Sequence, residues 1–445
     1  MKSCGKNYQL MIVLVTLITV TVMSSPIHAQ FSLGGQLVQR GEYRHGYGRL
    51  IADNADPAAF ISQRLRLEGS YKWEKITLFA SIQDIRTWGN TSQIKLTDNL
   101  LSIHEAWIKL PFNEFWSVQL GRQELNYDNV RFLGNLDWVL QARAHDFARI
   151  RYEKSNFKLH IGAGFNQSGE LLSGNLLTTP DQYKAAQMIR LENKHGKFDY
   201  SLLFWNNGRQ YVQRDSLGQV VEKDTRYIHT FGIPQARYQL GKLQMSAFYY
   251  HQSGKDVSGT KLDAYDVSLQ AAYTLSIDDL KNSRLKFLAG YEVISGNDQS
   301  DPDEANHSFE PMYGTNHVHN GYMDYFYAGG RHSHSVGLHD AFAGITYHPH
   351  DKAFISTQVH SFAADGVIYN GNDQMDFSLG TEIDATVGYV FNKAISVQAG
   401  YSQMFASPSL KFLQQVPNAS DIQNWVYVML IFRPDSDKKF IGVVL

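Results

Sequence analysis

Apolar and polar residues alternate along most of this chain, from Phe31 to Phe432, in stretches of about ten residues. Such alternation places successive side chains on opposite faces of a β-strand. The strands can be phased by asking which alternate set is aliphatic or aromatic, since a one-residue slip would exchange the two faces. This phasing predicts eighteen strands, at residues 31–44, 60–73, 75–87, 101–110, 115–127, 142–153, 157–166, 185–195, 198–209, 227–240, 242–253, 263–275, 284–296, 337–348, 353–363, 377–391, 394–405 and 423–432.

The connections between these strands alternate between short and long. Every second connection has only a few residues and is typical of a hairpin turn: residues 73–75, 111–114, 154–156, 196–197, 241–242, 351–352 and 392–393. The connections between them include residues 45–59, 178–184, 211–226 and 297–336. Short periplasmic turns and long extracellular loops are typical of an outer-membrane barrel.

The even number of strands makes the first and the last strand antiparallel neighbours, so that residues 31–44 can pair with residues 423–432. Closure is required in hydrocarbon, because every backbone N–H and C=O must find its partner within the protein. A soluble sandwich or propeller also alternates, but it gives no reason for connections that alternate in length. We therefore predict an all-β fold, a transmembrane antiparallel barrel in a Gram-negative outer membrane.

One face of each predicted strand suits lipid. On two strands this face consists of Ile76, Leu78, Ala80 and Ile82, and of Leu285, Phe287, Ala289, Tyr291 and Val293. Aromatic residues near strand ends are expected to form girdles at the level of the lipid headgroups: Tyr71, Trp73, Trp107, Trp116, Tyr152, Tyr200, Tyr238, Tyr347, Tyr389 and Trp425.

The opposite face carries charge, which a dry core would not tolerate. In the first half it is rich in arginine, whereas the second half places Asp266, Glu292, Asp340, Glu382 and Asp384 on it. The lumen is therefore expected to have a basic side and an acidic side. Arginine rings select anions in narrow pores; alternatively, these arginines pair with neighbouring carboxylates and only hold the shape of the barrel.

The first residues have the pattern of a secretory signal. Lys2 and Lys6 precede an apolar run at residues 10–22, and Ala29 is a small residue suited to a cleavage site. A membrane anchor is the alternative, but the run is shorter than the roughly 20 residues that a spanning helix needs. We predict three regions: a signal peptide at residues 1–29, the barrel at residues 30–432 and a tail at residues 433–445.

Removal of the signal changes the chemistry of the chain. Cys4 leaves with it, so the exported protein has neither thiols nor disulfides. Loss of Lys2 and Lys6 changes the formal net charge from −2 to −4, and nothing in the remainder suggests a nucleic-acid partner.

Motifs around the fifth and sixth predicted strands narrow the choice among barrels. They read Gly121-Arg122-Gln123-Glu124-Leu125, then Arg131, Gly134, Asp137-Trp138, Arg143, His145-Asp146-Phe147 and Arg149. Supporting motifs are Gln83-Asp84-Ile85-Arg86 with Trp88-Gly89, and His104-Glu105-Ala106-Trp107. Over essentially the whole mature chain, this sequence resembles the alginate export family of outer-membrane barrels.

The resemblance implies an eighteen-stranded barrel with an electropositive lumen, gated by loops, that conducts an anionic uronate polymer outward. Motif and strand phase together assign the substrate-binding constriction to Arg64, Arg66, Arg86, Arg122, Arg143, Arg149, Arg151 and Arg190. Outer-membrane lipid, an anionic polysaccharide or oligosaccharide, and periplasmic export proteins are the implied partners.

Catalysis and cofactor binding find little support. The chain has no nucleophile elbow and no phosphate-binding glycine loop, and His339 with Ser361 is a weak candidate for a rim lipase. The predicted loop at residues 297–336 holds His307, His317, His319, His332 and His334, but without a third anchored ligand at a known metal spacing. We expect no enzyme activity, no metal and no cofactor, and we expect this aromatic loop to fold into the mouth of the barrel.

The leading hypothesis is a channel that passively conducts anionic or polar saccharides through an arginine-lined, loop-gated lumen. The alternatives are a generic porin for small nutrients and a non-conducting adhesion or structural barrel. The acidic second half does not favour a long polyanion. The solute, the direction of transport, the oligomeric state, the gating loop and the role of residues 433–445 stay open.

Overall fold

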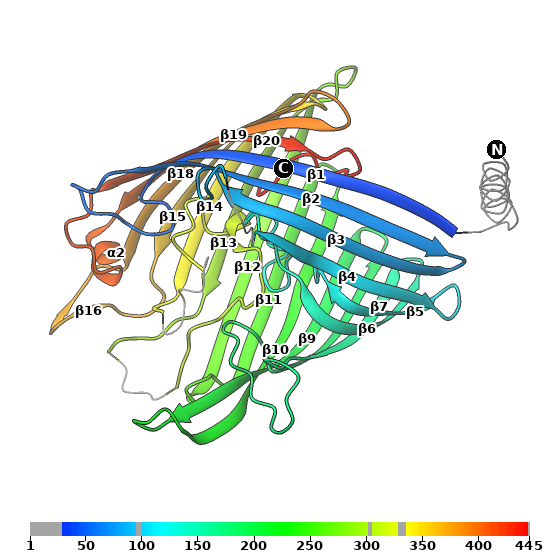
Figure 1. Cartoon of the computed structure of the whole chain (residues 1–445). Helices are drawn as coiled ribbons and strands as arrows, with labels where there is room; N and C mark the ends of the chain where they lie inside the picture. The colour runs from blue at the N-terminus through cyan, green and yellow to red at the C-terminus, as the bar shows by residue number, and fades with distance from the viewer. Residues whose placement is uncertain (1–28, 95–99, 301–304, 328–334, 444–445) are drawn as a thin grey trace, which may run out of the picture.

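The computed structural model describes residues 29–94, 100–300, 305–327 and 335–443. The predicted signal peptide lies outside these residues except for Ala29, which begins the first strand. Eighteen antiparallel strands form one sheet that wraps into a barrel (Figure 1). The strands are β1 Ala29–His45, β2 Ala58–Trp73, β3 Ile76–Thr87, β4 Leu101–Pro111, β5 Trp116–Gln123, β6 His145–Lys154, β7 Phe157–Phe165, β8 Ala185–His195, β9 Phe198–Arg214, β10 Val220–Leu240, β11 Leu243–Lys255, β12 Lys261–Asp278, β13 Ser283–Ile294, β14 Leu338–His350, β15 Ala353–Ala363, β18 Ser378–Val390, β19 Ile395–Ala406 and β20 Ile422–Phe432.

The first and last strands close the sheet. β1 pairs with β2 along one edge and with β20 along the other, from Leu37 opposite Phe432 to His45 opposite Asn424. The predicted fold and the predicted number of strands are therefore confirmed. Four short elements lie outside the barrel wall: the hairpin β16 Tyr369–Asn370 and β17 Asp373–Gln374, the 3-10 helix η1 Asn316–Val318 and the helix α2 Pro408–Leu413. Neither helix in the described part of the chain has the length or apolarity to cross a membrane.

Side chains on the outer face are apolar and exposed, as lipid contact requires. Leu65 is 44% exposed, Ile345 49% and Val428 55%, whereas the residues on either side of them in sequence point inward and are much less exposed. The buried apolar core lies inside the barrel, where segments of the chain fill the lumen. Two predicted girdle residues are wrong: Trp425 is fully buried on the inner face, and Trp107 faces inward and stacks on Phe79 at 5.1 Å.

The prediction of a loop at residues 211–226 is also wrong. Most of residues 211–226 continue the β9–β10 hairpin, which the green ribbon of Figure 1 shows projecting beyond the barrel. Asp215 forms the turn, accepting hydrogen bonds from the backbone N–H groups of Leu217 and Gln219 at 2.9 and 2.8 Å. A hairpin that extends beyond the barrel wall (Figure 1) needs no apolar face towards lipid, and the alternation that marks the other strands is absent from this part of the sequence.

Candidate functional site

An inner loop, residues 124–144, turns from the end of β5 into the lumen instead of outward. Its apolar residues Phe132, Leu133 and Trp138 are almost fully buried there. The sequence predicts one strand at residues 115–127, but β5 ends at Gln123 because the chain bends inward at Glu124. The inner loop, which carries part of the arginine-rich motif, therefore occupies the lumen of the barrel.

The basic side of the lumen holds this inner loop. The guanidinium of Arg190 on β8 donates to both carboxylate oxygens of Asp128, at 3.0 and 2.6 Å. Arg64 on β2 donates to Asp137 at 2.7 Å and to the carbonyl oxygen of Leu140 at 3.1 Å. The two-pronged contact of Arg190 with Asp128 is strong and directional, and together with the bonds from Arg64 it fixes the loop against the wall.

Arg131 extends from the inner loop to the acidic side. Its side chain is fully buried and donates to Asp266 on β12 at 2.7 Å and to Glu292 on β13 at 2.5 Å. Burial lowers the pKa of Arg131, but these two carboxylates outweigh burial and raise it above its ordinary value. The inner loop thus bridges the lumen from the arginine-rich wall to the carboxylate-rich wall.

A second segment, the long loop of residues 295–337, also folds into the barrel over its described residues 305–327, as expected. It lies beside the inner loop: Gly134 N–H donates to the carbonyl oxygen of Tyr313 at 2.8 Å, and Thr315 N–H to that of Val130 at 2.8 Å. Gly314 allows this approach, since a Cβ there would lie 2.1 Å from the carbonyl oxygen of Arg131. Any larger residue would push the two loops apart.

Acidic residues of the wall accept hydrogen bonds from the backbone and a side chain of the long loop. Met323 N–H donates to Glu382 at 2.8 Å, and the Asn320 side chain donates to Asp340 at 3.2 Å. Asp340 also contacts His360 on β15 at 3.0 Å. The second half of the lumen is therefore occupied by the protein's own loop, which uses the carboxylates as acceptors.

His319 makes this docking sensitive to acid. It is half-buried, with Nε2 3.1 Å from the carbonyl oxygen of Asn129, and desolvation, followed by the nearby charge of Arg131, lowers its pKa to about 3. An undocked loop would give this histidine an ordinary pKa of about 6.5. The released loop therefore binds a proton that the docked loop excludes, so docking is strongest above about pH 6.5 and weakens as the pH falls towards 3.

A third segment, the tail segment of residues 433–443, enters the lumen behind β20. Arg433 donates to Asp137 of the inner loop at 2.5 Å. Further along, the Gln398 side chain donates to the carbonyl oxygen of Ile441 at 2.9 Å, and Ile441 N–H donates back to it at 3.1 Å. Gly442 packs on Trp138, which stacks on His317 of the long loop at 3.8 Å. The tail segment and both loops therefore meet inside the lumen.

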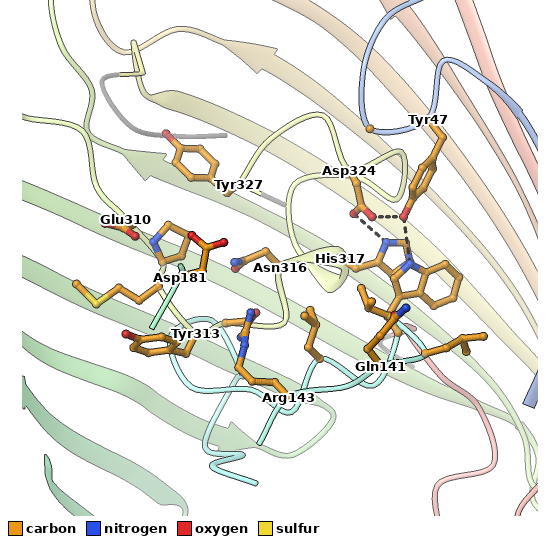
Figure 2. A pocket seen from close by; sticks show the side chains of 18 of the residues that line it. Tyr47, Gln141, Arg143, Asp181, Glu310, Tyr313, Asn316, His317, Asp324 and Tyr327 are labelled. Atoms are coloured by element: carbon orange, nitrogen blue, oxygen red, sulfur yellow. Dashed lines mark hydrogen bonds and ion pairs between the residues drawn. The ribbon is translucent and has the colours of Figure 1, made fainter. Parts of the chain in front are cut away.

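Cavities border the filled lumen towards both of its ends among the described residues, and two are relevant to transport. The larger, about 1160 Å³, lies towards the extracellular side, where Arg143, Tyr313 and Asn316 face the same space (Figure 2). The smaller, about 760 Å³, lies at the periplasmic end and is lined by Lys242, Lys286 and other residues. Basic side chains therefore border open space at both ends of the blocked lumen.

Arg143 is a half-buried arginine of the larger cavity that no carboxylate neutralises among the described residues. Its guanidinium donates to the carbonyl oxygen of Gly314 at 2.9 Å and has no ion pair with any residue that the structure describes. Arg209, which lines the same cavity, is instead bound to Glu310 at 2.5 Å. Burial lowers the pKa of Arg143 to about 10, because no carboxylate offsets the desolvation of its charge.

The other predicted arginines divide between the two faces of the wall. Arg64, Arg66, Arg149, Arg151 and Arg190 face the lumen from β2, β6 and β8. They bind loop or wall residues: Arg66 donates to Gln83 at 2.9 and 2.7 Å, Arg149 to Gln119 at 3.0 Å, and Arg151 to Glu153 at 2.6 Å. The interpretation of carboxylate-paired arginines fits Arg64, Arg151 and Arg190. Arg66 lies 3.8 Å from Glu124, and Arg149 has no ion pair among the described residues.

Arg122 faces outward, against the prediction, whereas Arg86 borders the larger cavity from the end of β3. Arg86 belongs to the same alternate set as outward-facing Ile82 and pairs with Asp84. Gln119 on β5 faces inward, and Arg122, three residues further on, belongs to the opposite, outward-facing set. It pairs with exposed Asp146 at 3.1 Å. The observed strand phase therefore contradicts the assignment of Arg122, and the role of Arg86 stays a prediction.

The described histidines support neither a metal site in the long loop nor a catalytic pair of His339 with Ser361. His317 pairs with Asp324 at 2.9 Å and His319 lies elsewhere, against Asn129, while His332 and His334 lie outside the described residues. Both ring nitrogens of His339 are occupied, by Tyr291 at 2.6 Å and Asp365 at 3.0 Å, which leaves neither for Ser361.

A closed barrel with an apolar outer face, a charged lumen and loops folded inside it defines a porin-like outer-membrane protein. The sequence pattern of the alginate export family matches residues 29–411, and the chain belongs to this family. No curated protein sequence matches the chain. The family and the fold are those of outer-membrane transport barrels and place the protein in a Gram-negative outer membrane.

Solved structures show the same fold at low sequence identity. OccAB4 of Acinetobacter baumannii is 11% identical with a TM-score of 0.58, and the match covers 92% of this chain and 99% of that one. OccK11 (OpdR) of Pseudomonas aeruginosa is 12% identical with a TM-score of 0.53, covering 91% and 95%. OpdK of the same organism is 9% identical with a TM-score of 0.53, covering 90% and 98%.

Proposed function

We propose that this protein is a passive channel for small anionic saccharides, above all short uronates, and that its inner loop and long loop form the gate. A solute passes when these loops are released from the barrel wall. The basic residues at both ends of the lumen attract an anion into it.

The lack of a carboxylate partner for Arg143 among the described residues is the main support for this proposal. A guanidinium that is largely desolvated, borders a cavity and lacks a carboxylate is a ready partner for the carboxylate of a solute. Tyr313 and Asn316 beside it offer a ring face and an amide suited to a sugar (Figure 2). The neighbouring Arg44, in contrast, is already bound to Glu42 at 2.8 Å.

The dimensions favour a short solute over a threaded polymer. A cavity of about 1160 Å³ is at the upper end of the roughly 300–1,000 Å³ typical of small-molecule sites. Beyond it the inner loop and the buried carboxylates Asp266 and Glu292 close the path, and an acidic wall repels a long polyanion. An oligosaccharide of a few units fits this combination best.

Glucuronate block of the ionic current through the full chain in planar bilayers tests the proposal. The variant Arg143→Gln should weaken the block by roughly tenfold to 100-fold, the loss expected for a hydrogen bond to a charged group. Arg122→Gln is the matched control, because it removes the same charge from the outer face. Equal block in all three proteins would contradict the assignment, and equal block by glucose and glucuronate would favour a generic porin.

A further inference from the structure

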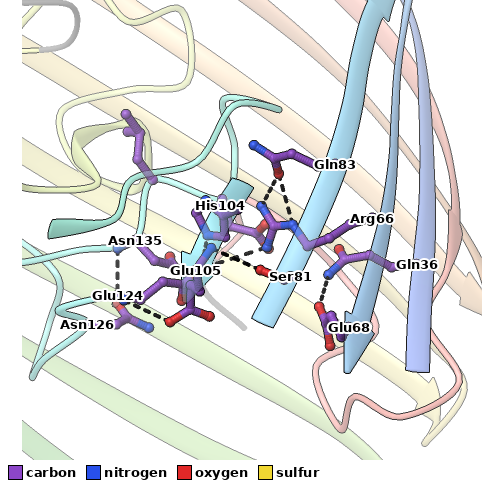
Figure 3. Close-up of polar contacts among 12 residues, drawn as sticks. Gln36, Arg66, Glu68, Ser81, Gln83, His104, Glu105, Glu124, Asn126 and Asn135 are labelled. Carbon is purple, nitrogen blue, oxygen red and sulfur yellow. Dashed lines mark hydrogen bonds and ion pairs between the residues drawn. The ribbon is translucent and has the colours of Figure 1, made fainter. Parts of the chain in front are cut away.

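A cluster of potential metal ligands lies where the inner loop leaves the wall. His104 and Glu105 on β4 and Glu124 at the start of the inner loop bring one imidazole and two carboxylates together (Figure 3). One ligand atom from each lies within 4.8 Å of the others. The cluster shares no residue with the cavity around Arg143.

A β-bulge creates this arrangement. Ser81 on β3 pairs with Glu105, but the next residue, Ile82, pairs with Ile103, so His104 is an extra residue in β4. Successive residues of a regular strand point to opposite faces, whereas the bulge turns both His104 and Glu105 inward. His104 is consequently 4% exposed although it precedes an inward-facing residue.

The protein's own donors satisfy these three side chains incompletely. His104 Nε2 lies 2.8 Å from Glu124 Oε1, and Glu105 Oε1 accepts from Glu124 N–H at 2.9 Å and from Trp107 Nε1 at 3.2 Å. Glu105 Oε2 has no hydrogen-bond partner, and Glu105 has no ion pair, among the described residues. One carboxylate therefore stays without a cation.

Arg66, the cation closest to the cluster, binds mainly to Gln83. Arg66 donates to Gln83 through two nitrogens at 2.9 and 2.7 Å and reaches Glu124 only at 3.8 Å. Two carboxylates thus share one distant guanidinium, which leaves the cluster net negative when His104 is neutral. The side chain of Glu124 is 23% exposed, so an ion can enter from water.

We propose that His104, Glu105 and Glu124 bind a divalent transition-metal cation of the zinc class. One imidazole nitrogen with two carboxylates suits such ions better than Ca²⁺ or Mg²⁺, which prefer ligands that are all oxygen. Bonds of about 2.0–2.2 Å place ligand atoms about 3–4 Å apart, a change from 4.8 Å that glutamate rotation supplies. The ion ties the first residue of the inner loop to β4.

Co²⁺ is a suitable probe, because its visible absorption reports the ligands that surround it. The full chain, purified in detergent and stripped with a chelator, should bind one Co²⁺ with a new absorption band, and Zn²⁺ should displace it. His104→Ala should weaken binding by roughly 100-fold or more, at or above the loss seen for outer-shell partners. His195→Ala, at an exposed periplasmic turn, is the control and should bind as the unchanged protein does.

A second variant protects the test against misfolding. Glu124→Gln keeps an oxygen for Asn135, which donates to Glu124 Oε2 at 2.9 Å, yet removes the ligand charge. It should lose Co²⁺ binding while its heat-modifiable gel mobility is retained. Absence of saturable binding by the unchanged protein would overturn the proposal, and so would equal binding by the folded His104→Ala or Glu124→Gln proteins.

Discussion

Replacement of Arg131 by glutamine removes the cation that the inner loop brings to the acidic wall. The guanidinium is fully buried and binds Asp266 at 2.7 Å and Glu292 at 2.5 Å. Glutamine is too short and too weakly polar to reach both carboxylates. The docked loop would then leave two buried carboxylates without their partner, whereas release of the loop exposes them to water.

The expected magnitude follows from this loss of a partner. Removing one member of a buried ion pair costs about 3–5 kcal/mol, mostly because a charge is left uncompensated. If the whole cost falls on the docked state, the equilibrium between docked and released loop shifts by roughly two to four powers of ten. A loop that is almost always docked would become released for a measurable part of the time.

Single-channel recording in planar bilayers measures this population directly. The variant Arg131→Gln should show more frequent or larger open states than the unchanged protein. Arg122→Gln, whose ion pair with Asp146 is exposed on the outer face, should not. Heat-modifiable mobility should be retained, because the closure of β1 on β20 does not involve Arg131. Indistinguishable recordings of all three folded proteins would refute the assignment of the inner loop as the gate.

Three further changes test the other contacts in the lumen. Truncation before Pro434 removes most of the tail segment while keeping Arg433 and its bond to Asp137, and should raise the conductance of the periplasmic end; unchanged unitary current would exclude an obstructing tail. His319→Gln should flatten the rise in open probability that we expect between pH 6.5 and 5, where the histidine weakens docking by about 2 kcal/mol; an equally steep rise in the variant would contradict this role. Gly314→Ala should separate the two loops and expose the chain to limited proteolysis, and an unaltered cleavage pattern would show that the close approach is not needed.

The barrel itself was predictable because lipid imposes a rule on every strand. A sequence such as Leu285 to Val293 must keep one alternate set free of charge, and closure in hydrocarbon follows from the need to pair the backbone. The rule fails where lipid contact ends. The distal β9–β10 hairpin has no apolar face, and Trp425 looks like a girdle residue although it lies inside the barrel.

The filling of the lumen was only partly predictable. Aromatic residues in the long loop indicated insertion, and an apolar run around Phe132 and Trp138 gives the same signal in the inner loop. Their docking positions depend on pairs far apart in sequence, such as Arg131 with Asp266, for which no local pattern exists. The cluster at His104 depends on a one-residue bulge, which alternation alone does not reveal.

The reversal potential of the open channel in a salt gradient tests the central claim most directly. We expect unitary currents from the full chain, or from the Arg131→Gln variant with its released loop, that reverse on the anion-selective side. Neutralising Arg143 should move that potential towards the unselective value. Cation selectivity, or silence of both proteins at every voltage after correct insertion, would contradict an anion channel gated by its own loops.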